Sequence, residues 1–305
     1  MLKLTKEMME PVDAEQLNAD LVVRPNISYW QDAWRRLKKN PMAMCALGVL
    51  IIIIILAIVG PSIKGLDYVS INSSQKNIKP NGQYWFGTDN FGRDLFSRIW
   101  IGARISIAIA LSATAIKVVI GSLYGAAMAY FGGFVDQLLM RIIEIISSIP
   151  DLILTMLIMI VLGNGKVSLL IALCFTAWIN TARMLRGQIM QLRECEYVLA
   201  AEALGASPAR IITKHLIPNT IGLLILDIAT AIPGIIFAES SLSFLGIGLQ
   251  TPDFSLGSLL ASGQSAMAFY PYQLVCPSIV LCLIVLSFNL FGDGLRDALD
   301  PKLRQ

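Results

Sequence analysis

The feature that most constrains the fold is a stretch of 18 consecutive residues without a charged side chain, residues 42–59. At about 1.5 Å per residue, a helix of this length crosses most of a hydrocarbon core about 30 Å thick. A cleaved signal peptide is the alternative, but about forty residues precede the stretch and further apolar segments follow it. The stretch therefore predicts a membrane-spanning helix near the N-terminus.

Five further apolar segments have the length of a spanning helix: residues 105–130, 135–162, 168–185, 221–237 and 275–291. Only helices and closed barrels satisfy their backbone groups in lipid, and these segments are too long and too weakly alternating for barrel strands. Charged residues make up 15% of the chain, against about 25% in soluble domains. We expect an all-α membrane bundle of six transmembrane helices rather than a soluble enzyme.

Lysine and arginine placement predicts the orientation of this bundle, because cytoplasmic loops carry the excess of these residues. With both termini inside, 16 of the 24 lie on the cytoplasmic side and seven outside, with Lys117 left within a span. The net charge of only +3 does not indicate a nucleic-acid partner.

Spans and orientation together predict how the chain is divided. A cytoplasmic tail with an interfacial helix at 1–41 is followed by a first span at 42–60 and an extracytoplasmic loop at 61–102. A five-helix core follows at 103–295 and includes a cytoplasmic loop at 186–219. The chain then continues as a cytoplasmic tail at 296–305.

A short amphipathic helix is expected just before the first span. Ser28 is a suitable N-cap, and Asn40-Pro41 ends the segment. Apolar residues recur at helical spacing, with basic residues on the other face; they are Trp30, Ala33, Trp34 and Leu37 against Arg35, Arg36, Lys38 and Lys39. This pattern is typical of a helix lying in the headgroup region, and packing against a cytoplasmic partner is the alternative.

Four acidic residues in or just beyond the predicted spans are candidates for a role inside the membrane: Glu144, Asp151, Asp227 and Glu239. A charge inside a membrane costs about 2.5 to 3.5 kcal/mol on insertion scales, so such residues face a partner or a wet cavity. Their functional interpretation is a gate or a pathway lining. Structural pairing is the alternative, with Lys117 as a possible partner for one of them.

Two of these acids belong to the third span. Glu144 and Asp151 are seven positions apart, which places them on one face of a continuous helix. Arg141 stands three residues before Glu144, and mutual neutralisation of this pair is favoured over a proton relay. Pro150 predicts a kink.

No segment has the pattern of a catalytic, metal or nucleotide site. The glycine-rich turn at residues 163–166 ends in lysine but lacks the first glycine and the hydroxyl residue of a phosphate loop. A single histidine and five dispersed cysteines do not assemble a metal site. We expect no cofactor in this chain, so any ATP and Mg²⁺ must be bound by another chain.

The most informative cytoplasmic segment is residues 194–219, ECEYVLAAEALGASPARIITKHLIPN. It predicts two short helices. Gly205 ends the first in the left-handed conformation, and Ser207 with Pro208 begins the second as N-cap and first helical residue. A compact, alanine-rich elbow of this kind is shaped to enter a groove on a partner.

This elbow resembles the EAA motif of the binding-protein-dependent ABC importer permeases. Ala200, Ala201 and Gly205 match the motif, followed at the proper distance by Ile217-Pro218. Leu199 stands where the family has the glutamate that names the motif, which removes the polar contact of that glutamate. The resemblance implies a coupling helix that docks on an ATP-binding subunit, with Leu199, Ala200, Ala201, Gly205, Ala206 and Ser207 as the coupling residues.

Three further segments resemble the C-type permease of dipeptide, oligopeptide and nickel importers: FGTDNFGRD at 86–94, ESSLSFLG at 239–246 and GLRDALDP at 294–301. The resemblance covers about residue 28 to the C-terminus. It implies a bacterial cytoplasmic-membrane protein that pairs with a second permease as a heterodimer, with two ABC ATPase subunits and with an extracytoplasmic solute-binding protein.

The function predicted from this resemblance is the permease subunit of an ATP-driven peptide importer, which performs no bond chemistry itself. A nickel importer of the same family is the alternative. A proton-coupled secondary transporter is less favoured because no inverted repeat is visible. An intramembrane hydrolase is disfavoured because the lone histidine lies in the cytoplasmic loop.

Overall fold

The computed structural model describes residues 29–65, 68–250 and 253–299. Across these ranges the ordered elements are helical, with one isolated β-bridge between Thr88 and Asp94. The predicted cap at Ser28 and the last residues of the C-terminal motif lie outside the described residues. The elements are α2 (Tyr29–Lys39), α3 (Pro41–Lys64), η2 (Ser73–Gln75), α4 (Leu95–Phe131), α5 (Gly133–Ser147), α6 (Asp151–Leu162), α7 (Lys166–Arg193), α8 (Glu196–Ala203), α9 (Pro208–Ile211), η3 (Ile212–Leu216), α10 (Ile217–Asn219), α11 (Ile221–Phe244), α12 (Leu256–Ala266) and α13 (Tyr272–Leu299).

Six membrane spans are confirmed when the bent pair α5 and α6 is taken as one of them. Helices α3, α4, α7, α11 and α13 are each long and apolar enough to cross a membrane. Helix α4 begins at Leu95, ten residues before the predicted span. Asp94 caps it by accepting hydrogen bonds from the backbone N–H and the hydroxyl of Ser97, at 2.8 and 2.6 Å. Arg98 falls in the predicted extracytoplasmic loop at 61–102, yet it belongs to α4 and its side chain is buried.

The predicted third span is not one continuous helix. Helices α5 and α6 meet at an angle of 82° across a break of three residues that ends in Pro150. Proline has no N–H to donate and disfavours a helical conformation in the residue before it, so the helix ends there. The expectation that Glu144 and Asp151 share one helix face is therefore wrong, because the two residues belong to different helices.

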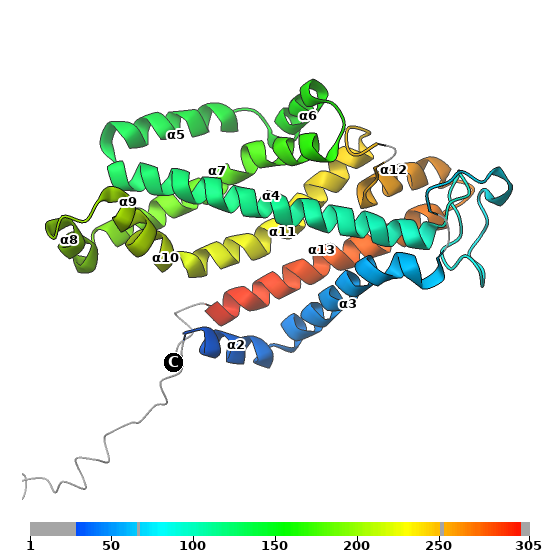
Figure 1. Cartoon of the computed structure of the whole chain (residues 1–305), viewed down its shortest axis with the longest axis horizontal. Helices are drawn as coiled ribbons and strands as arrows, with labels where there is room; N and C mark the ends of the chain where they lie inside the picture. Colours follow the sequence, from blue (N-terminus) through cyan, green and yellow to red (C-terminus); the bar gives the residue numbers. More distant parts are fainter. Residues whose placement is uncertain (1–28, 66–67, 251–252, 300–305) are drawn as a thin grey trace, which may run out of the picture.

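Helix α4 occupies the centre of the bundle and packs against α3, α7 and α11 (Figure 1). Its contact with α7 depends on two glycines. A Cβ on Gly121 would lie 2.6 Å from the Cβ of Thr181, and one on Gly125 would collide with the backbone of Ala182. These two glycines, four residues apart, allow the close approach of α4 and α7.

Helix α2 lies across the end of α13 and continues into α3 (Figure 1). Its buried residues are Ala33 and Leu37, whereas Trp30 and Trp34 are about half exposed. Asn40 ends the helix and caps α3 by accepting a hydrogen bond from the backbone N–H of Ala43 at 3.2 Å. The helix and its boundary are confirmed, and its place in the headgroup region stays a prediction.

The two ends of the bundle carry different elements. Helices α2, α8, α9 and α10 lie at one end, and the loop before α4 lies at the other with α12 (Figure 1). This separation agrees with the predicted cytoplasmic and outer sides, although the orientation itself stays a prediction. Helix α12 was not predicted. It begins at a capping box in which Ser255 and Ser258 each bond the other's backbone.

Candidate functional site

The elbow between α7 and α11 has the predicted local structure. Gly205 adopts φ +79°, in the left-handed region. The N–H of Ala206 donates to the carbonyl of Ala201 at 3.0 Å, and the N–H of Gly205 donates to the carbonyl of Glu202 at 2.9 Å. These two bonds form a Schellman motif, which explains why a glycine ends α8. Ser207 caps α9 by accepting a long hydrogen bond of 3.4 Å from the N–H of Arg210.

The inner face of the elbow is anchored to the bundle. Val198, Ile211 and Leu216 are fully buried. They share a hydrophobic cluster with Ala129 at the end of α4 and Ile189 on α7. Burial of each such side chain is worth about 1.5 to 3 kcal/mol, so the elbow is seated firmly on two spanning helices.

The exposed face of the elbow carries two large apolar side chains. Leu199 is 50% exposed and Leu204 is 87% exposed. The six predicted coupling residues lie on this elbow: Ala200, Gly205 and Ser207 are exposed like Leu199, whereas Ala201 and Ala206 are half-buried. The elbow extends beyond the ends of the spanning helices (Figure 1). Its geometry suits docking into a partner, and its coupling role stays a prediction.

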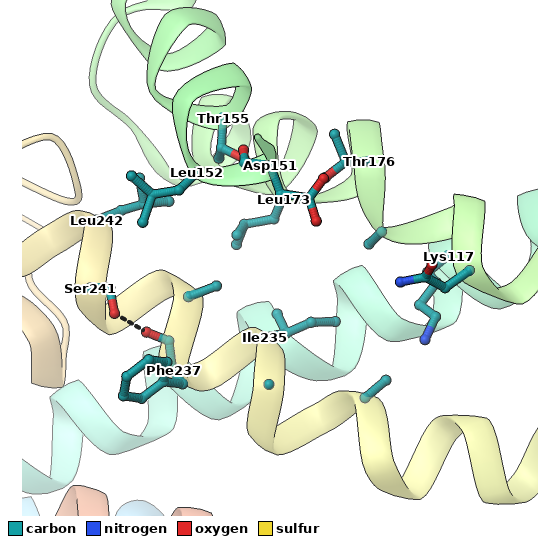
Figure 2. A pocket seen from close by; sticks show the side chains of 15 residues that line it. Lys117, Asp151, Leu152, Thr155, Leu173, Thr176, Ile235, Phe237, Ser241 and Leu242 are labelled. Atoms are coloured by element: carbon teal, nitrogen blue, oxygen red, sulfur yellow. Dashed lines mark hydrogen bonds between the residues drawn. The ribbon is translucent and has the colours of Figure 1, made fainter. Parts of the chain in front are cut away.

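A cavity of about 420 Å³ opens between α4, α6, α7 and α11. Figure 2 shows its lining side chains, which reach it from all four helices. Most are apolar. The polar lining residues are Lys117, Asp151, Thr155, Thr176, Asn180 and Ser241. The cavity is open to its surroundings rather than enclosed.

The four intramembrane acids fall into distinct environments, and one of them lines this cavity. Asp151, at the start of α6, is a lining residue. Glu144 lies away from it on the exposed side of α5, where it forms an ion pair with Arg141 at 2.8 Å. The predicted neutralisation of Glu144 is confirmed.

Asp227 lies in a polar junction of three helices that includes the cavity residue Lys117. The Nζ of Lys117 on α4 donates to Oδ1 at 3.0 Å, and the hydroxyl of Thr181 on α7 donates to Oδ2 at 2.7 Å. The predicted partnership of Lys117 with an intramembrane acid is confirmed. This junction ties α11 to the α4 and α7 pair.

Glu239 is completely buried, in a second junction near the other end of α11. Its carboxyl group accepts hydrogen bonds from the hydroxyls of Ser106 on α4 at 2.8 Å and Ser243 at 2.9 Å. Ser255, the cap of α12, lies 3.3 Å from the hydroxyl of Ser243. The prediction that Glu239 faces the bundle interior is confirmed, and its partners hold α4, α11 and α12 together.

The segment 86–94, in the loop before α4, also connects distant parts of the chain. Thr88 is fully buried, and its hydroxyl donates to the carbonyl of Gln75 at 2.6 Å. Its own carbonyl accepts hydrogen bonds from Gln273 at 2.9 Å and Tyr272 at 3.1 Å, both at the start of α13. Asp89 forms an ion pair with Arg93 at 2.8 Å. The motif therefore joins the loop before α4 to the start of α13.

Comparison with known proteins agrees with this geometry. Residues 117–305 match the family described as "Binding-protein-dependent transport system inner membrane component", and residues 28–80 match the "N-terminal TM domain of oligopeptide transport permease C". The chain belongs to this permease family. It is accordingly a multi-pass inner-membrane protein, a transport permease subunit rather than a catalytic enzyme.

Several curated relatives match this permease over almost their whole length. The oligopeptide transport system permease protein OppC of Bacillus subtilis strain 168 is 40% identical over 305 residues, which covers both chains completely. The dipeptide transport system permease protein DppC of the same strain is 43% identical over 288 residues, 94% of this chain and 90% of the relative. The glutathione transport system permease protein GsiD of Escherichia coli O6:K15:H31 is 36% identical over 291 residues, 94% and 96% of the two chains.

Proposed function

We propose that this permease is one of two membrane subunits of an ATP-driven importer of dipeptides or oligopeptides. The full-length identity of 40% to an oligopeptide permease carries this proposal. The chain pairs with a second permease, which closes the open cavity. Two ABC ATPase subunits bind ATP and Mg²⁺, and an extracytoplasmic solute-binding protein delivers the peptide. This chain holds no cofactor of its own.

The elbow supplies the contact with the ATPases in this proposal. Its exposed apolar face, formed around Leu199, Leu204 and Gly205, fits a groove on the partner. Closure of the ATPase subunits displaces the elbow, and the buried side of the elbow transmits the movement to α4 and α7. The spans then repack between outward and inward access. Both termini and the elbow lie in the cytoplasm.

Uptake by the complete transporter in proteoliposomes tests the proposal. The second permease, the ATPases, the binding protein and this chain are reconstituted together. Radiolabelled di-, tri- and pentapeptides, glutathione and Ni²⁺ are then supplied outside, with ATP inside. We expect ATP-dependent accumulation of peptides.

Two results contradict the proposed function. Accumulation of Ni²⁺ without any accumulation of peptides assigns the chain to a nickel importer. Peptide uptake that persists without ATP and stops when a proton ionophore is added assigns it to a proton-coupled transporter. A transporter assembled without this chain is the control, and it should accumulate nothing.

A further inference from the structure

Asp151 stands at the break in the bent third span. Helix α5 has 15 residues, and at about 1.5 Å per residue it rises only about 22 Å, which is too short to cross a hydrocarbon core about 30 Å thick by itself. Helices α5 and α6 have the length and composition of a span only as a pair. Asp151, the first residue of α6, therefore places an acidic side chain part-way along this span rather than at its end.

Asp151 also differs from the other intramembrane acids in having no partner. Throughout the described part of the chain its carboxyl group makes no hydrogen bond or ion pair, and only its backbone carbonyl is used, by the hydroxyl of Thr155 at 2.7 Å. Glu144 is paired with Arg141, Asp227 with Lys117, and Glu239 with serine hydroxyls. An unpaired acid part-way along a spanning segment requires water or a cation from elsewhere.

The cavity supplies the place where such a cation would bind. Asp151 lines it together with Thr155 and Thr176, and Figure 2 shows these three side chains grouped on one wall. The other charged lining residue, Lys117, is held by Asp227 at 3.0 Å. Its positive charge is thus neutralised, and the net charge of this wall is the negative charge of Asp151.

We propose that Asp151 binds the positively charged groups of a peptide in transit, so that the cavity favours cationic over acidic peptides. This inference rests on the proposed function as a peptide importer. An ammonium or guanidinium group forms a charge-assisted hydrogen bond with a carboxylate. The hydroxyls of Thr155 and Thr176 provide further acceptors beside it. This charge preference is a property of the permease itself.

Three tripeptides of equal length and different charge test this preference. Initial uptake of Ala-Lys-Ala, Ala-Ala-Ala and Ala-Glu-Ala is measured in the reconstituted transporter with wild-type chain and with Asp151→Asn. The solute-binding protein is the same in both preparations. The ratio of variant to wild-type uptake for each peptide therefore removes the selectivity of the binding protein.

We expect Asp151→Asn to lower the ratio for Ala-Lys-Ala roughly threefold to tenfold more than the ratio for Ala-Glu-Ala, with Ala-Ala-Ala between them. Asp151→Glu keeps the charge and should keep the wild-type order. Glu144→Gln is the matched control, since it removes an acid that is paired with Arg141 outside the cavity. This control should change the three ratios equally or leave all of them at one.

Other outcomes overturn the inference. If the ratio of Asp151→Asn to wild-type uptake is equal for the three peptides, Asp151 does not distinguish peptides by their charge. Failure of Asp151→Asn to co-purify with the second permease, while Asp151→Glu assembles, means that the acid pairs with a cation of that subunit instead. Absence of peptide uptake by the wild-type transporter contradicts the proposed function itself. The wild-type measurement therefore tests the function, and the comparison of variant with wild type tests the charge preference.

Discussion

Replacing Gly205 by valine tests the elbow as the coupling element. Gly205 has φ +79°, and a Cβ built on it meets no atom of this chain within 4 Å. The substitution therefore costs only backbone strain, about 1 to 2 kcal/mol for a residue in the left-handed region and more for a β-branched one. The expected local effect is a distorted end of α8, with the Schellman bonds from Gly205 and Ala206 weakened.

This strain is smaller than the energy that seats the elbow. Val198, Ile211 and Leu216 are fully buried between the elbow and the bundle. At about 1.5 to 3 kcal/mol each, they contribute about 5 to 9 kcal/mol. Gly205→Val should therefore insert and co-purify with the second permease, while the exposed face of the elbow no longer fits the ATPase.

The assay compares ATP hydrolysis stimulated by the loaded binding protein with peptide uptake, both in lipid. We expect Gly205→Val to lose most of both activities. Gly205→Asn is the matched control for the backbone, because asparagine tolerates the left-handed conformation, and it should retain more coupling than valine does. Leu199→Ala should have a much smaller effect, since the motif's usual polar group is already absent there.

Normal transport by Gly205→Val would refute the assignment of the elbow as the coupling element. Loss of transport together with loss of the chain from the membrane would instead show that the substitution impairs folding, so the amount of inserted protein is measured in every preparation. The informative result is an assembled complex whose ATPase activity no longer responds to the loaded binding protein.

Three further predictions concern orientation, nucleotide binding and the Lys117 junction. In a cysteine-free background, a thiol at Asn81 should react with an impermeant reagent applied outside and one at Ser207 should not; the reverse pattern contradicts the topology. The purified chain should show no stoichiometric ATP binding in equilibrium dialysis, because it has no phosphate-binding loop. Lys117→Met leaves the partly buried Asp227 without its cation. It should destabilise the protein in thermal unfolding by about 3 kcal/mol, the lower end of the cost of breaking a buried pair, whereas adding Asp227→Leu should restore much of that loss.

The elbow could be predicted closely from the sequence because its signals are local. The N–H of Gly205 bonds to the carbonyl three residues before it, and the N–H of Ala206 bonds to the carbonyl five residues before it. Ser207 caps α9 through the N–H three residues after it. Such hydrogen bonds depend on spacing alone. The spans were predictable for a similar reason, since helix length and hydropathy are set within each segment.

The polar junctions could not be located in the same way. Lys117 and Asp227 are 110 residues apart, and Ser106 and Glu239 are 133 apart. Serine and threonine are common in spanning helices, so no sequence signal distinguished Ser106 or Thr181 as partners. Helix α12 was missed because its capping box uses Ser258 at the position where glutamate or glutamine is the usual signal.

Helix α11 connects these elements physically. It follows the elbow through α10, and Asp227 fixes its first half to α4 and α7. Glu239 fixes its last part to α4 and to the start of α12. Between these two junctions lies Pro233, which removes a backbone hydrogen bond, and Gly234 beside it lines the cavity. A change of cavity shape through α11 must therefore bend the helix at Pro233 or break one of its two polar junctions.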